Sequence, residues 1–189
     1  MIIHSLKLLG ALFYHNHSKA DGEDIVNALI DEEVLHQQTL DALLSIDEQQ
    51  LHSDFSVLFE GIGTMPVPPW GSVYLDKEQV LFGDSNVRYR LFLHNNGITL
   101  DSGQREPEDQ FGLMLLACAY FLEQNQQQTA NELLGEHLMP WADTYLEQLS
   151  LKAPNAFYKA LATDVQQWLH LYIKQQNISV TKQKIYLNE

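Results

Sequence analysis

The chain has 189 residues, 45% hydrophobic and 19% charged, which suffices for one sizeable core, so we expect a single domain with two lobes. The formal net charge is −14, with 25 acidic against 11 basic side chains, which excludes phosphate-rich partners such as nucleic acids and favours basic ones. The only cysteine, Cys118, lies in an apolar run too short to span a membrane, and no export signal is evident, so we expect a reduced, cytoplasmic protein.

Apolar residues recur every three to four positions through the first half of the chain, which is typical of amphipathic helices. The pattern predicts helices within the first 45 residues, and Asp47 with Gln50 resembles a capping box that opens a further helix ending at Gly61. The prolines of segment 61–73 exclude a helix interior or a central strand, so we expect a stiff loop that carries apolar side chains.

The second half continues this pattern. It predicts a helix over 84–95, a polar connection over 97–105 that is a candidate hinge, and a central helix over 107–124 that is apolar on all sides. Further helices are expected over 129–149 and after Pro154, and only the tail 178–187 shows a brief strand-like pattern. The sequence therefore predicts an all-α helical bundle, either a monomer or a dimer that exchanges halves through the hinge.

The segment from Glu106 to Gly112 places a cluster of carboxylates directly before the apolar central helix. Pro107 suits a first helical turn, and Glu108 and Asp109 carry negative charge where free backbone N–H groups favour it. Two interpretations remain open: ordinary helix-start chemistry with no ligand, or two carboxylates, Glu106 and Asp109, that bind arginines of another chain.

Signatures of catalysis and cofactor binding are absent from the sequence. It contains no phosphate-binding loop or dinucleotide fingerprint, and Ser72 lacks the second glycine of a nucleophile elbow. His15 and His17 lie two positions apart and His137 has no second histidine one turn on, so we expect no metal site. We expect no enzyme activity and no cofactor, with His137 and Trp141 serving helix packing.

Four segments, taken in order, resemble the TorD/DmsD family of redox-enzyme maturation chaperones. They are MPVPPWGSVY at 65–74, VLFG at 80–83, EPEDQFG at 106–112 and HLMPW at 137–141. The early run LLGALFY at 8–14 is similar to the opening helix of that family, and the likeness is closest to its DmsD branch. Gln110 departs from the pattern, since the family usually carries histidine there; glutamine keeps donor and acceptor capacity but cannot become cationic.

The resemblance implies an all-helical cytosolic chaperone that binds the twin-arginine (Tat) signal peptide of a molybdenum enzyme of the dimethyl-sulfoxide-reductase type. Such a chaperone holds the leader peptide until cofactor insertion and folding are complete, and only then allows export. Components of the Tat translocase are further candidate partners. The alternative is an interaction module for a cytosolic metalloenzyme that has no twin-arginine leader.

A twin-arginine leader combines an arginine pair with an apolar segment, so its receptor needs carboxylates beside an open apolar groove. We expect Asp109 and Glu106 to bind arginine, with Gln110 in the same binding motif. We expect Ser72 and Gly83 to permit close approach of the peptide backbone. The side chains expected to line the groove are Phe55, Leu58, Phe59, Trp70, Tyr74 and Phe82.

Overall fold

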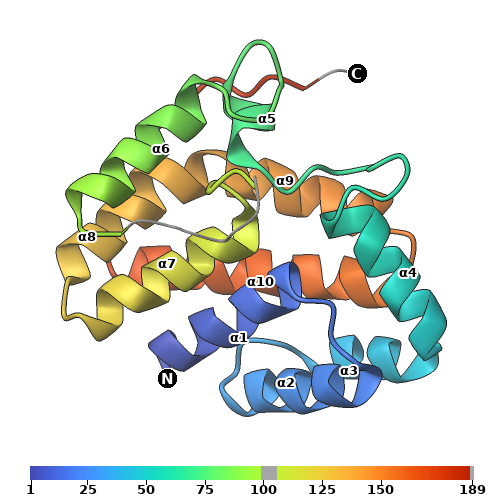
Figure 1. Ribbon diagram of the computed structural model, residues 1–189. Helices are drawn as coiled ribbons and strands as arrows, with labels where there is room; N and C mark the ends of the chain where they lie inside the picture. The colour runs from blue at the N-terminus through green and yellow to red at the C-terminus, as the bar shows by residue number, and fades with distance from the viewer. Residues whose placement is uncertain (99–105, 188–189) are drawn as a thin grey trace.

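The computed structural model describes residues 1–98 and 106–187, and over these residues the chain is helical with no strand (Figure 1). This confirms the predicted all-α class. No helix in these two ranges is long and apolar enough to cross a membrane. The elements are α1 (Ile2–Tyr14), α2 (Lys19–Asp31), α3 (Gln37–Ser45), α4 (Glu48–Phe59), α5 (Gly71–Leu75), α6 (Asp84–Asn95), α7 (Phe111–Glu123), α8 (Gln127–Glu132), the π-helical segment η1 (Leu133–Leu138), α9 (Met139–Lys152) and α10 (Ala156–Gln175).

One hydrophobic core joins the two halves of the chain, with buried side chains from Leu6 to Leu169 in a single cluster. At its centre α7 packs along α1, while α10 packs against α9 and α3 (Figure 1). The predicted hinge over 97–105 falls largely on residues 99–105, outside the described residues, so the division into two lobes stays a prediction.

The contact between α1 and α7 depends on two glycines. A Cβ atom on Gly112 would lie 2.7 Å from the carbonyl oxygen of Gly10, and a Cβ on Gly10 would lie 2.6 Å from Cγ of Leu116. The absence of both side chains lets the helix backbones approach closely. Burial on the same helix raises the pKa of Cys118 to about 12, as expected for a packing residue rather than a nucleophile.

The predicted start of the central helix at Pro107 is wrong, because α7 begins at Phe111 with Gln110 as its N-cap. The side-chain oxygen of Gln110 accepts a hydrogen bond from the backbone N–H of Leu113 at 2.9 Å. Glutamine is not among the preferred N-cap residues, so capping rules pointed to the proline and acids upstream. Glu108 and Asp109 therefore lie in the loop before the helix and not in its first turn.

The helix predicted over 129–149 is divided by the π-helical segment η1. There the N–H of Met139 donates to the carbonyl of Leu134, five residues back, and Pro140 follows without any N–H to donate. After α10 the tail 178–187 is extended, but it forms no strand ladder with the described residues. It runs back over η1 and α5.

Candidate functional site

The acidic segment and the Trp70 loop, far apart in sequence, lie against each other as one unit. The N–H of Gly71 donates to the carbonyl of Asp109 at 3.1 Å, and the N–H of Phe111 donates to the carbonyl of Pro69 at 2.8 Å. Between these bonds Trp70 and Gln110 form an isolated antiparallel bridge. Two of the motifs identified in the sequence therefore meet at the start of α7.

Asp109 fastens this unit together. It is 3% exposed, and its Oδ2 accepts a hydrogen bond from the N–H of Ser72 at 2.6 Å while Oδ1 accepts one from Nδ2 of Asn86 at 3.0 Å. Burial raises the pKa of Asp109, and the hydrogen bonds from Ser72 and Asn86 act in the opposite direction. An ion pair between Asp109 and an arginine stays a prediction, and the guanidinium would share the carboxylate with these two donors.

Glu106 lies on a different side of the same segment, in an open pocket of about 640 Å³. The hydroxyl of Tyr14 donates a hydrogen bond to the Glu106 carboxylate, and none of the ion pairs among the described residues includes Glu106. Burial raises the pKa of Glu106, because partial desolvation disfavours the charged form. The pocket is lined by Tyr14, His15, Asn16, Phe59, Glu60, Gly61, Trp70, Leu81, Glu106, Pro107 and Gln110.

Trp70 forms an apolar wall of the Glu106 pocket. Its ring is nearly buried, and its Nε1 is enclosed without a hydrogen-bond partner in the described ranges. Beside it, Val80, Leu81 and Phe82 are exposed, and Leu81 also lines the pocket. The structure thus places an exposed apolar segment next to a half-buried carboxylate.

The other aromatic and aliphatic residues predicted for the groove lie mainly in the core. Phe55 and Leu58 are buried, whereas Phe59 is buried but reaches the wall of the Glu106 pocket. Tyr74 is also buried, with its ring stacked on that of Trp141 at 5.5 Å between centroids. Of these residues only Phe59 lies where a ligand in the Glu106 pocket could touch it.

The two positions expected to admit a peptide backbone make close contacts within the chain itself. A Cβ on Gly83 would overlap the carboxylate of Asp76, which accepts the N–H of Ser85 at 3.1 Å at the start of α6. Ser72 is fully buried. A role for either residue in peptide contact stays a prediction.

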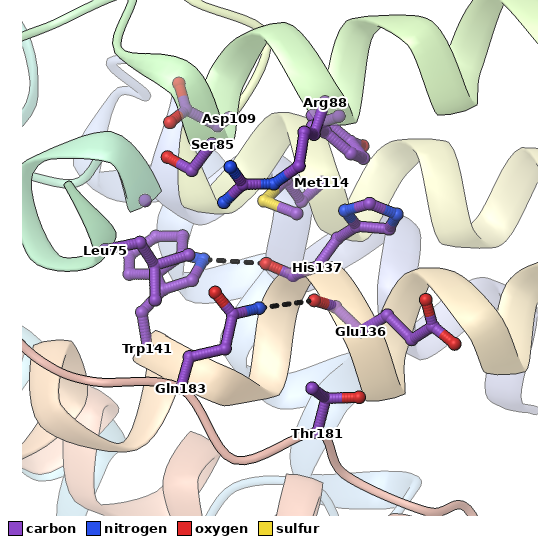
Figure 2. A pocket seen from close by; sticks show the side chains of 12 residues that line it. Leu75, Ser85, Arg88, Asp109, Met114, Glu136, His137, Trp141, Thr181 and Gln183 are labelled. Carbon is purple, nitrogen blue, oxygen red and sulfur yellow. Dashed lines mark hydrogen bonds between the residues drawn. The ribbon is translucent and has the colours of Figure 1, made fainter.

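Asp109 also borders a smaller, separate pocket of about 140 Å³, shown in Figure 2. Arg88 extends into it from α6, His137 from η1 and Gln183 from the C-terminal tail (Figure 2). Burial, with a smaller contribution from Arg88, lowers the pKa of His137 to about 4, so its ring is neutral at physiological pH. The two predicted arginine acceptors, Glu106 and Asp109, therefore face different pockets.

Several residues that line these pockets or bond to Asp109 were not predicted from the sequence. Tyr14 and Glu60 lie at the C-terminal ends of α1 and α4, where a polar residue beside a loop is too common to indicate a site. Asn86 is fully buried on α6, and a polar residue at a core-facing position is the signal that could have identified it. In the ranges 1–98 and 106–187, no three His, Cys, Asp or Glu side chains group together to hold a metal ion.

Known proteins similar to this chain identify its family. A profile described as "Nitrate reductase delta subunit" matches residues 27–147. The protein named Tat proofreading chaperone DmsD of Salmonella typhimurium is 37% identical over 164 residues, which is 82% of this chain and 80% of that relative. The chain belongs to the TorD/DmsD family of redox-enzyme maturation chaperones.

Further TorD/DmsD comparisons agree with this assignment. The Haemophilus influenzae protein named "Probable Tat proofreading chaperone DmsD" is 38% identical over 185 residues, covering 88% of this chain and 91% of the relative. A crystal structure of a redox enzyme maturation protein from Archaeoglobus fulgidus shares the fold, with a TM-score of 0.64 at 16% identity over 90% of this chain and 94% of that one. The Salmonella and Haemophilus relatives are named as chaperones and not as enzymes, which supports the expectation that the chain belongs to a family of chaperones without enzyme activity.

Proposed function

We propose that this protein is a cytoplasmic chaperone that binds the twin-arginine signal peptide of a molybdenum-containing reductase of the dimethyl-sulfoxide-reductase type. It holds the leader until cofactor insertion and folding are complete. Family membership and the name Tat proofreading chaperone, carried by its relatives, support this function over a module for a leaderless metalloenzyme. Components of the Tat translocase are candidate partners for the release step.

The observation that carries the proposal is the Glu106 carboxylate, half-buried and without a cationic partner among the described residues. A guanidinium group in this pocket would give the half-buried carboxylate a partner of opposite charge. Charged hydrogen bonds of this kind contribute about 1.5–3 kcal/mol each. Glu60, which also lines this pocket, offers a second acceptor for an arginine pair. The formal net charge of −14 attracts a cationic leader from a distance.

The apolar part of the leader has its own surface beside this carboxylate. We assign it to Trp70 and to the exposed segment Val80, Leu81 and Phe82. Burial of a few hundred Å² of the leader's apolar surface contributes roughly 25 cal/mol per Å². Together with two charged bonds, this binding free energy exceeds the roughly 8 kcal/mol of micromolar binding before ordering costs are subtracted. Binding is therefore expected to be reversible, as release for export requires.

Calorimetric titration with a synthetic twin-arginine leader tests this assignment. Glu106→Gln should weaken binding about tenfold, the equivalent of about 1.4 kcal/mol. Replacing both arginines of the peptide by lysine should also weaken it, because lysine cannot form the bidentate pair. Glu147→Gln on α9 is the matched control, since Glu147 is exposed and lies outside the pocket. Equal affinity of Glu106→Gln and Glu147→Gln for the leader would remove the Glu106 pocket from the proposal.

The solution state belongs to the same proposal. We expect a monomer, or a dimer that exchanges halves through segment 97–105. Size-exclusion chromatography with light scattering distinguishes the two, and only monomer in every preparation would count against the exchange.

A further inference from the structure

Two successive backbone carbonyls of η1, those of Gly135 and Glu136, lack their usual α-helical donors, because Pro140, four residues after Glu136, has no N–H. The N–H of Met139 donates to the carbonyl of Leu134, and Pro140 has no N–H, so the carbonyl of Gly135 loses both of its usual helical donors. The carbonyl of His137 accepts a hydrogen bond from Nε1 of Trp141 at 3.0 Å. This segment, which overlaps the HLMPW motif, therefore leaves the carbonyls of Gly135 and Glu136 available to donors from outside the helix.

The C-terminal tail occupies these acceptors in an extended conformation. The N–H of Thr181 donates to the carbonyl of Gly135 at 2.9 Å, and Nε2 of Gln183 donates to the carbonyl of Glu136 at 3.2 Å (Figure 2). Further along, the N–H of Tyr186 donates to the carbonyl of Tyr74 at 2.8 Å. Two of the three bonds involve only main-chain atoms, so an extended peptide of another sequence can form them as well.

Gly135 makes room for the extended chain. A Cβ at this position would overlap the carbonyl oxygen of Ser179 and lie 3.1 Å from Cγ2 of Ile178. Helix propensity favours alanine over glycine at an interior helical position by about 1 kcal/mol, so the glycine here serves the tail and not the helix. The absence of a side chain at Gly135 therefore leaves room for a backbone that passes directly over η1.

The tail carries a basic pair next to apolar residues, as the leader does, with lysine in place of arginine. Lys182 and Lys184 are exposed, and the partly buried Ile185 and Tyr186 follow directly. A cationic pair next to apolar residues is the pattern expected of the proposed ligand, and it stands out in a chain with only 11 basic residues. The tail therefore resembles, within one molecule, the peptide that the protein is proposed to bind.

The surface of η1 and α5 that the tail contacts, called here the tail seat, lies next to the Glu106 pocket. Thr181 and Gln183 form one wall of the small pocket that Asp109 borders from the other side. Gly71 lines this small pocket, whereas its neighbour Trp70 lines the Glu106 pocket, so a single loop separates the two. A leader anchored at Glu106 can cross this loop and continue along η1.

We propose that the surface of η1 and α5 beneath residues 179–186 is a second part of the leader site, and that the tail occupies this surface until a leader displaces it. The occupant is an extended peptide segment with basic residues next to apolar ones. This inference rests on the proposed function, which supplies the leader.

The first experiment removes or loosens the tail. Fluorescence anisotropy with a labelled twin-arginine leader compares the full chain with a variant lacking residues 179–189. If the tail is seated nine-tenths of the time, truncation should strengthen leader binding about tenfold. Thr181→Pro, which deletes the N–H that Gly135 accepts, should strengthen binding in the same direction in the full chain, whereas Thr181→Ala keeps that N–H and should not.

The second experiment asks whether the leader uses the same seat. In the truncated chain, Gly135→Ala places a methyl group where the extended backbone would pass, and it should reverse the gain in leader affinity. A synthetic peptide of residues 179–187 should bind the truncated chain, compete with the leader, and lose its binding in Gly135→Ala. Thermal melting of each variant shows that the fold is kept.

Two results would overturn the inference: leader affinity unchanged by both the truncation and Thr181→Pro, or leader and tail peptide bound equally well by the truncated chain with and without Gly135→Ala. If no variant binds the leader while the tail peptide still binds the truncated chain at Gly135, the seat exists and the proposed function is the part that fails.

Discussion

The side chain of Gln110 ties the start of α7 to the last turn of α1, because its Nε2 donates a hydrogen bond to the carbonyl of Phe13 at 2.8 Å. Its Oε1 caps α7 by accepting the N–H of Leu113, and the residue is 1% exposed. One amide group thus satisfies a donor and an acceptor that would otherwise be buried without partners. A neutral side chain with both capacities is what this position requires.

Gln110→Ala should lower the free energy of unfolding by about 1–3 kcal/mol, because it leaves the Phe13 carbonyl and the Leu113 N–H unpaired in the interior. Gln124→Ala is the matched control: Gln124 is the exposed C-cap residue of the same helix, and its loss should stay within about 0.5 kcal/mol. Urea denaturation measures both. Equal stability of the two variants would show that the Gln110 hydrogen bonds contribute nothing net.

Asp109→Asn should be tolerated, whereas Asp109→Ala should not. The asparagine oxygen can still accept the Ser72 N–H. Its new amide group would face Nδ2 of Asn86, but a flip of the Asn86 side-chain amide presents Oδ1, which has no partner among the described residues, as an acceptor. Alanine leaves the Ser72 N–H unpaired and should cost about 1–3 kcal/mol of unfolding free energy. Chemical denaturation compares the variants, and an equal loss of stability in both would contradict the expectation.

The Asp109→Asn variant also separates two roles of this residue in leader binding. If Asp109 only holds the Trp70 loop in place, its neutral analogue keeps the parent affinity for the leader. If Asp109 receives an arginine directly, as the sequence suggested, affinity falls while stability is preserved. Titration of the folded variant with the twin-arginine leader decides between the two.

Gly112→Ala should destabilise the fold by about 1–3 kcal/mol, because the new methyl group meets the Gly10 carbonyl oxygen, which can move only with its helix. Gly22→Ala on α2 is the control, since its Cβ would meet only Cδ2 of Leu43 at an ordinary 3.7 Å. That change should be neutral or stabilising, by up to about 1 kcal/mol, through helix propensity. Thermal unfolding of the pair tests the α1–α7 contact, and equal melting temperatures would argue against it.

Leader affinity should fall as the pH is lowered. Because burial raises the pKa of Glu106 above the ordinary 4.5, its carboxylate becomes protonated at a higher pH than an exposed glutamate and then no longer attracts a guanidinium. Protonation of His15 on the same pocket wall adds repulsion at lower pH, since burial lowers the pKa of that ring. Titrations across the acid range should show a steeper loss for the parent than for Glu106→Gln, and parallel curves would contradict this assignment.

The sequence predicted the helices well where apolar spacing is regular, and α6 has the predicted bounds 84–95. The sequence-based prediction failed at the start of α7. The N-cap residue there is the buried Gln110, which also bonds to Phe13 in another helix. The prediction also missed the division at η1, since an apolar pattern does not reveal how Pro140 shifts hydrogen bonding by one residue.

The candidate site was predictable as motifs but not as geometry. The sequence brought Glu106, Asp109 and Trp70 into one site, and the structure does place their segments side by side. That Glu106 faces one pocket and Asp109 another depends on how residues 106–110 turn between two loops. For an aromatic residue such as Phe55, the sequence is equally compatible with a place in a groove and a place in the core, because the exposure of its side chain is set by neighbours distant in the chain.

The stability of the protein should decrease between about pH 6.5 and pH 4 through His137. Burial, and secondarily Arg88, lower the folded-state pKa of His137 to about 4, while the unfolded chain titrates near the ordinary 6.5. Over this range the unfolded state binds a proton that the folded state does not, so acid favours unfolding, by a few kcal/mol at most. His137→Gln removes the titrating ring. The unfolding free energy of the variant, measured by urea denaturation at several pH values, should therefore fall less steeply with decreasing pH than that of the parent. Identical slopes in the two proteins would mean that the ring, packed against Tyr89 and Phe92, titrates alike in the folded and unfolded states.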